Sequence, residues 1–207
     1  MQEILPGLWW WTTVHERWGI EIGSYWLEPE RVLIDPRVPA EGLERFAAGG
    51  GPAAVLLTNR HHDRHSARFA ERFGCPVMCH RDGLHEFDPG RRVEPFLPGD
   101  VLPGGVVAVE VDAICPDEVA LHIPAHRAVG VADGLVRMPS DAPLGFVPDA
   151  LMDDPARTKA GLVAAYARLL ERDFDTLLMA HGHPIVGGAR DALRRFVEER
   201  ADEGSTA

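Results

Sequence analysis

The chain has 207 residues, a formal net charge of −11 and 45% hydrophobic residues, which suits one folded domain with a substantial core. The acidic charge and the lack of any Lys/Arg run argue against a general nucleic-acid binder or a protein drawn to anionic membranes. No apolar stretch reaches the ~18 residues that a membrane span needs. The first residues lack a basic and an apolar region, so we expect no secretion signal there. Three cysteines without zinc-ribbon spacing suit a reducing compartment, so we expect a cytoplasmic protein.

The first half of the chain predicts mostly strands, because runs rich in β-branched and aromatic residues alternate with Gly and Pro. The expected strands span residues 8–13, 20–27, 31–34, 53–57 and 76–80. A short helix is expected over 40–48 and a longer one over 64–73. The irregular segment 82–102 is either a lid over a site or a surface loop.

The second half predicts further strands and two amphipathic helices. Its expected strands span residues 106–111, 118–123, 128–132 and 176–179, with a hairpin between the second and the third. The helices are expected over 156–172 and 188–200, followed by a frayed tail over 201–207. This order fits two sheets with helices packed outside, in a single domain over residues 1–207.

The densest chemistry follows the strand that ends near Thr58. Three His and one Asp lie within the five residues from His61 to His65. Such a loop lies at the carboxyl end of a strand, where α/β proteins commonly bind ligands. Gathering these groups is costly unless they meet a metal, a substrate or each other. Asp35 also follows a strand, and we expect it to hydrogen-bond a loop near the same place.

Four landmarks in order along the chain resemble the metallo-β-lactamase superfamily, which includes the glyoxalase II-like hydrolases. They are Leu33-Ile34-Asp35, the loop from Thr58 to His65, Val131-Ala132-Asp133-Gly134, and Leu178-Met179-Ala180-His181-Gly182. The resemblance implies an αββα sandwich of two mixed β-sheets with helices on the outer faces. It also implies a hydrolase of small molecules. From the acidic charge and the lack of a membrane-spanning stretch, we expect neither nucleic acid nor a membrane as a partner.

The loop departs from the family's metal-binding pattern. In the family a Thr precedes His-x-His-x-Asp-His. Alignment on Thr58 leaves His61 and Asp63 as the matching His and Asp, whereas Asn59 and Arg64 stand at the other two His positions. The resemblance therefore implies a degenerate loop that has lost two imidazoles.

The remaining family ligands are partly present. Asp133 matches the carboxylate that bridges two metal ions, and His181 matches the last metal His. Ile114 or Cys115 stands where the family has a further His. The usual two-metal site cannot be assembled from these residues, so the dinuclear centre is eroded.

Three interpretations remain open. In the first, one zinc, iron or manganese ion activates water to hydrolyse a small ester, thioester or lactone. Its ligands would be Asp63, Asp133 and His181, and His61 or His65 would add a ligand or a base. In total, the predicted metal ligands are His61, Asp63, Asp133 and His181. The predicted catalytic residues are Asp63, His61, His65 and Arg64.

In the second interpretation no metal is bound. The guanidinium of Arg64 replaces the ion by pairing with Asp63 or Asp133, and the pocket binds a small molecule or a partner, or performs acid/base chemistry with its histidines. In the third, the same residues form a satisfied polar network inherited with the fold and have no activity.

Overall fold

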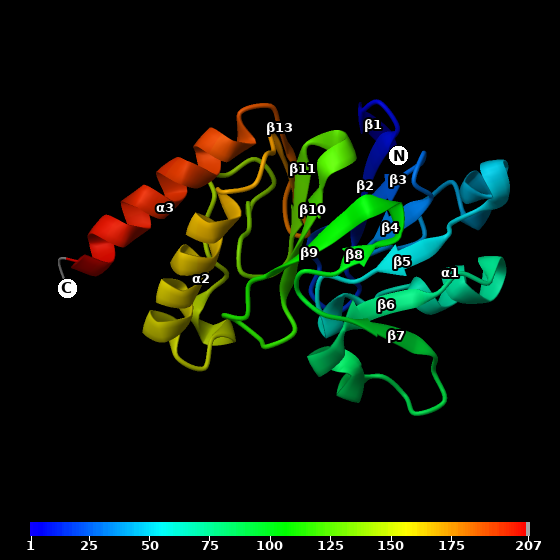
Figure 1. The fold of residues 1–207 in the computed structure, drawn as a ribbon, viewed down its shortest axis with the longest axis horizontal. Helices are drawn as coiled ribbons and strands as arrows, with labels where there is room; N and C mark the ends of the chain where they lie inside the picture. The colour runs from blue at the N-terminus through cyan, green and yellow to red at the C-terminus, as the bar shows by residue number, and fades with distance from the viewer. Residues whose placement is uncertain (206–207) are drawn as a thin grey trace.

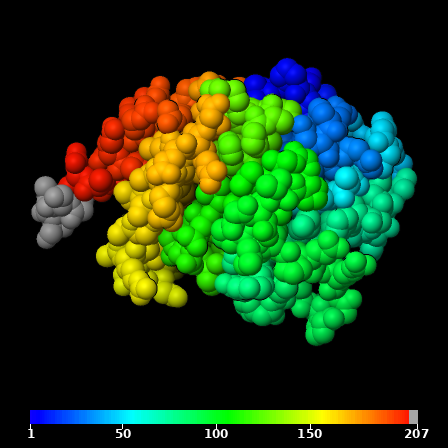
Figure 2. All heavy atoms as spheres, viewed as in Figure 1, coloured from blue at the N-terminus to red at the C-terminus, as the bar shows by residue number. Residues whose placement is uncertain are grey.

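Two β-sheets pack face to face and helices cover both outer faces (Figure 1). This computed structural model describes residues 1–205 of the chain. The space-filling view shows the first half of the chain on the right and the last third on the left (Figure 2). The predicted αββα sandwich of two mixed sheets is confirmed.

The first sheet has seven strands in chain order, β1-β2-β3-β4-β5-β6-β7. Their bounds are Gln2–Leu5, Leu8–Val14, Glu21–Leu27, Val32–Ile34, Ala54–Leu56, Val77–His80 and Val93–Phe96. Strands β1 to β4 run antiparallel to their neighbours, whereas β4 to β7 are parallel. In the parallel part Ile34 pairs with Leu56, so Asp35 and Thr58 leave the sheet at the same edge.

The second sheet has six strands in the order β13-β12-β11-β10-β9-β8. In chain order from β8 their bounds are Val101–Leu102, Val106–Glu110, Val119–Ile123, Ala128–Val131, Thr176–Met179 and Ile185–Val186. The pair β11 and β12 is parallel, and Val131 lies opposite Met179. Asp133 and His181 each follow these residues by two positions, so they emerge at one edge of the sheet.

Three α-helices cover the sheets, and their bounds are Ser66–Phe73 (α1), Pro155–Leu169 (α2) and Ala189–Ser205 (α3). Helix α1 packs on the first sheet, whereas α2 and α3 lie together on the second (Figure 1). Asp154 caps α2, since its side chain accepts a hydrogen bond from the backbone N–H of Arg157 at 3.1 Å. In the part of the chain that the structure describes, every helix is too short or too polar to traverse a bilayer.

Apolar side chains fill three layers of core. One cluster lies between the two sheets and includes Tyr25, Leu56 and Leu121. The other two join each sheet to its outer helices, around Phe69 on one side and Tyr166 on the other. Both sheets are therefore held on both faces, which leaves their edges and loops to carry a site.

Three expected segments differ in the structure. Two 3-10 turns, Leu43–Phe46 and Ala48–Gly50, replace the helix expected over 40–48, because Gly49 adopts a left-handed φ of 69°. The segment 82–102 is neither a lid nor a simple loop, since it supplies β7 and β8 at the edges of the two sheets. Helix α3 continues to Ser205 where we expected a frayed tail, and residues 206–207 lie outside the described part.

Candidate metal centre

The histidine loop turns sharply after β5. Thr58 and Asn59 lead into a 3-10 turn, Arg60–His62, and Asn59 caps that turn by accepting a hydrogen bond from the backbone N–H of His62 at 3.1 Å. Side chains three residues apart eclipse in a 3-10 turn. Asn59 and His62 therefore point to the same side, toward the second sheet, and His61 is exposed.

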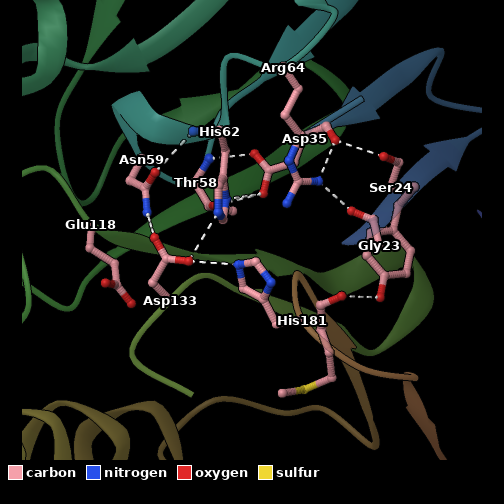
Figure 3. Close-up of polar contacts among 12 residues, drawn as sticks. Gly23, Ser24, Asp35, Thr58, Asn59, His62, Arg64, Glu118, Asp133 and His181 are labelled. Atoms are coloured by element: carbon pink, nitrogen blue, oxygen red, sulfur yellow. Dashed lines mark hydrogen bonds and ion pairs between the residues drawn. The ribbon is translucent and has the colours of Figure 1, made fainter. Parts of the chain in front are cut away.

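Asp35 fixes the orientation of His62 (Figure 3). The carboxylate of Asp35 is buried and accepts hydrogen bonds from the backbone N–H of Thr58 at 2.9 Å and from the Thr58 hydroxyl at 2.6 Å. Its Oδ2 also lies 2.9 Å from Nδ1 of His62. Nε2 of His62 is thereby left to face the second sheet. The prediction that Asp35 forms hydrogen bonds with a loop at this site is confirmed.

Asp133 joins the two sheets at the centre. Its Oδ1 lies 2.8 Å from Nε2 of His181 and 3.2 Å from Nε2 of His62. Its Oδ2 accepts a hydrogen bond from the side-chain amide of Asn59 at 2.8 Å. Figure 3 shows one oxygen of Asp133 joined by dashed lines to both imidazoles and the other oxygen joined to Asn59.

The charges of this cluster follow from its burial and its neighbours. Burial alone lowers the pKa of His62, but the carboxylates of Asp133 and Asp35 outweigh it and raise that pKa to about 9. Burial raises the pKa of Asp133, yet His62 and His181 bring it well below its ordinary value. For His181, burial outweighs the bond to Asp133 and lowers the pKa. At neutral pH without an ion, His62 is cationic, His181 is neutral and both carboxylates are charged.

Arg64 places a second cation beside the cluster. It adopts a left-handed φ of 48°, and its Nη1 donates to the backbone carbonyls of Gly23 and, at 2.7 Å, Asp35. We expected Arg64 to pair with Asp63 or Asp133, but the structure records no ion pair for it within residues 1–205. The reason is geometric, since the left-handed turn directs the side chain toward β3 and β4. Its Nε and Nη2 are buried without a hydrogen-bond partner.

Two other residues of the loop point away from the centre. Asp63 forms an ion pair with both terminal nitrogens of Arg91 and accepts a hydrogen bond from Ser66. His65 accepts a hydrogen bond from the backbone N–H of Val38 at 3.0 Å. Neither side chain joins Asp133 and His181, contrary to the arrangement we expected.

A buried carboxyl group lies close to the cluster on the second sheet. Glu118, at the end of the loop before β10, is 1% exposed, and its Oε1 accepts a hydrogen bond from the backbone N–H of Gly134 at 3.0 Å. Its Oε2 has no hydrogen-bond partner. Burial and the charge of Asp133 raise the pKa of Glu118 to about 8, so this group is protonated at neutral pH.

The ligand atoms of His62, Asp133 and His181 lie within 4.8 Å of one another, and this is the one such group among the described residues. Ligand atoms about 2.1 Å from one ion and at right angles to each other are about 3.0 Å apart. The separations of 2.8 and 3.2 Å around Asp133 match that spacing. A histidine ligand also commonly donates its second ring nitrogen to a carboxylate, as His62 does to Asp35. The residues therefore fit one divalent ion.

The cluster forms the base of a cavity of about 670 Å³. His61 and Arg64 line it together with the three-ligand group, as do Ile114 and Cys115. The other lining residues are mostly apolar and include Trp18, Ile20, Ile22, Val136, Met138, Val147 and Leu151. A cavity of this size and lining suits a small organic molecule.

The structure resembles solved members of one fold class. A metallo-β-lactamase from Pontibacter korlensis matches with a TM-score of 0.71 and 15% identity over 97% of each chain. A metallo-β-lactamase family protein from Thermus thermophilus matches with a TM-score of 0.68 and 14% identity, over 97% of this chain and 81% of that one. A protein solved in a di-iron-bound form matches with a TM-score of 0.60 and 23% identity, over 88% of this chain and 91% of that one.

These similarities, together with two mixed sheets between helices, define the class: the chain has the metallo-β-lactamase fold. By sequence, no protein-family model and no curated protein matches the chain. The glyoxalase II-like subtype stays a prediction.

Comparison of the predicted and observed sites shows a shift of one residue. The structure brings Asp133 and His181 together as the landmarks implied, but the imidazole that joins them belongs to His62 and not to His61. Alignment on Thr58 assigned His62 to a variable position of the motif. The capping pattern of Asn59 three residues before His62 is the sequence signal that points to His62.

Proposed function

We propose that the protein is a hydrolase of small esters, thioesters or lactones that holds one divalent metal ion on His62, Asp133 and His181. The observation that carries this proposal is the convergence of three ligand atoms at the base of a cavity. Two imidazoles and one carboxylate suit zinc, iron or manganese. Such an ion supplies Lewis acidity and makes water nucleophilic at neutral pH.

The surrounding residues orient the side chains that would bind the ion. Asp35 holds His62 with Nε2 toward Asp133, and Asn59 anchors the second oxygen of Asp133. His62 would hold the ion through Nε2, so its proton there would be released when metal is taken up. Arg64 adds a fixed positive charge that acts on Asp133, and this charge disfavours a second cation. The charge of Arg64 therefore supports a mononuclear centre.

His61 provides a proton acceptor outside the ligand group. Its side chain is exposed and lines the same cavity, and it lies in the 3-10 turn that also carries His62. An imidazole in that place exchanges protons with water and with a substrate leaving group. We assign His61 the role of base. Asp63 and His65 stabilise the loop through Arg91 and Val38 instead.

A metal-free pocket is the second candidate, and one observation favours it. The charges of Asp35 and Asp133 are already balanced by the cationic His62 and Arg64. The cluster thus needs no ion for neutrality, and the cavity would bind a small molecule without turnover.

Elemental analysis of the purified protein after incubation with zinc, manganese or ferrous iron separates the two candidates. The single-ion centre predicts about one equivalent of metal, lost in His62→Ala and His181→Ala and retained in His61→Ala. Metal should also raise the melting temperature of the wild type but not of His181→Ala. Hydrolysis of ester and thioester panels is then measured with the loaded protein.

The outcomes are distinct. If the wild type binds metal and both His62→Ala and His181→Ala lose it, the hydrolase proposal is supported. If the wild type binds no metal under any condition, the hydrolase proposal is refuted and the metal-free pocket is supported. Retention of metal in His62→Ala together with its loss in His61→Ala would mean that His61 is the ligand and would refute the assignment made from the 3-10 turn.

A further inference from the structure

The cavity above the centre has an apolar rim. Among the described residues, seven large hydrophobic side chains are well exposed, and three of them, Trp18, Met138 and Leu151, line this cavity. Their exposed fractions are 59%, 41% and 61%. Exposed apolar side chains concentrated at one cavity mark a binding surface for an apolar group.

The cavity is also rich in positive charge, although the protein as a whole is acidic. Arg37, Arg60 and Arg64 line it, whereas Asp133 is the single carboxylate in its wall and is already bound by two imidazoles. A low-dielectric cavity lined by one sign of charge attracts ligands of the opposite sign. The combination favours an anion that carries an apolar part.

Two of the three arginines are committed to internal partners. Arg60 is bound by the fully buried carboxylate of Asp117, which accepts hydrogen bonds from both its side chain and its backbone N–H. Arg64 donates to two backbone carbonyls, and its remaining nitrogens are out of reach of water. Release of either guanidinium would leave a buried group unpaired, which is costly.

Arg37 differs, because its carboxylate partner is easily solvated. Its side chain is 6% exposed and pairs with Glu16, whose side chain is 74% exposed, on the turn between β2 and β3. Nε of Arg37 is buried and has no hydrogen-bond partner. If Glu16 moved away, water would solvate its carboxylate, and the Nη2 of Arg37 that it now occupies would be open to another carboxylate.

We propose that Arg37 anchors the carboxylate of an amphiphilic substrate and that Glu16 occupies this place until the substrate displaces it. The apolar part of the substrate lies against Trp18, Met138 and Leu151. The inference rests on the proposed function and deepens it: the ester or thioester carries a free carboxylate, and Arg37 is a specificity-determining residue. Glu16 acts as an internal competitor.

The test compares octanoate with octan-1-ol, which share a chain length and differ in charge. Binding is measured by calorimetry and by quenching of tryptophan fluorescence, with Trp18→Phe to assign the signal. Both probes are titrated in chelator and again after metal loading. Because the measurement in chelator needs neither metal nor turnover, failure of the hydrolase proposal leaves it interpretable.

The wild type should bind octanoate about tenfold more tightly than octan-1-ol, and Arg37→Gln should bring the ratio to about one. Glu16→Gln should tighten octanoate about threefold and leave octan-1-ol unchanged. The exposed pair Arg92 and Glu94 lies outside the cavity lining, so Arg92→Gln and Glu94→Gln are matched controls that should behave as wild type.

Equal affinity of the wild type for the two probes would overturn the inference. If Arg37→Gln still preferred octanoate, another cation would bind the carboxylate and the role of Arg37 would be refuted. Arg37 is buried, so circular dichroism and thermal unfolding check that its variant folds. Glu16 is exposed and its variant is expected to fold in any case, so an unchanged affinity for octanoate in Glu16→Gln would overturn the competitor role independently.

Discussion

The buried carboxyl group of Glu118 allows a quantitative test of the electrostatics beside the centre. Replacement by Gln keeps the shape of the protonated acid and removes the ability to ionise. In the folded protein the pKa of Glu118 is raised from 4.5 to about 8, chiefly by burial and next by the charge of Asp133. The folded state therefore keeps a proton that the unfolded state has lost at neutral pH.

A raised folded-state pKa contributes stability that is complete below the unfolded pKa and is lost as the pH rises through the folded pKa. For Glu118 the loss extends from about pH 4.5 to about pH 8. Between about pH 6 and pH 9 this group alone should lower the free energy of unfolding of the wild type by about 3 kcal/mol. In Glu118→Gln this contribution to the pH dependence of the free energy of unfolding should be absent.

Urea unfolding at several pH values in this interval, in the presence of chelator, measures the difference between the two proteins. Groups that titrate in the same way in both proteins cancel when their free energies of unfolding are subtracted. As the pH rises from about 6 to about 9, Glu118→Gln should become more stable relative to the wild type by about 3 kcal/mol. The exposed Glu171 provides the control, since Glu171→Gln should show no such trend. A difference for Glu118→Gln that is constant with pH would refute a protonated buried acid next to Asp133.

Three further variants test the loop and the strands around the site. Asp63→Asn should lower the free energy of unfolding by about 1 kcal/mol through the weakened pair with Arg91, and should leave metal uptake unchanged. Loss of metal in a folded Asp63→Asn would return Asp63 to the ligand set. Gly182→Ala should destabilise by about 3 kcal/mol or more in urea unfolding, because the new Cβ would lie 2.1 Å from the carbonyl of Arg137 at a φ of +102°; a melting temperature equal to that of wild type would contradict this. Tyr25→Phe should cost about 1 to 2 kcal/mol, since the hydroxyl donates to a buried carbonyl of β12 at 2.8 Å, and a neutral effect would mean that water replaces the bond.

The general architecture follows from local patterns in the chain. Alternating apolar strands, the hairpin before Arg127 and the amphipathic stretch from Pro155 are determined by side-chain periodicity and turn residues, which act within a few positions. Asp133 and His181, which follow the two parallel strands β11 and β12, were also predicted, because the sequence around each of them resembles a family landmark. The segment 82–102 was not, because β7 and β8 are short edge strands that form only against partners already in place.

The composition of the site depended on contacts between residues distant in the sequence. His62 rather than His61 faces Asp133 because a 3-10 turn eclipses His62 with Asn59. Asp63 leaves the centre because Arg91, 28 residues later, pairs with it.

The sequence by itself determined the order of strands and helices, which local periodicity encodes, and its resemblance to a known family implied the fold class and a polar site at two strand ends. Only the tertiary structure decided which imidazole completes the site, and where Arg64 and Arg37 direct their charges. Those outcomes depend on small rotations of the backbone and on competition among carboxylates. Neither is visible until the two sheets are packed together.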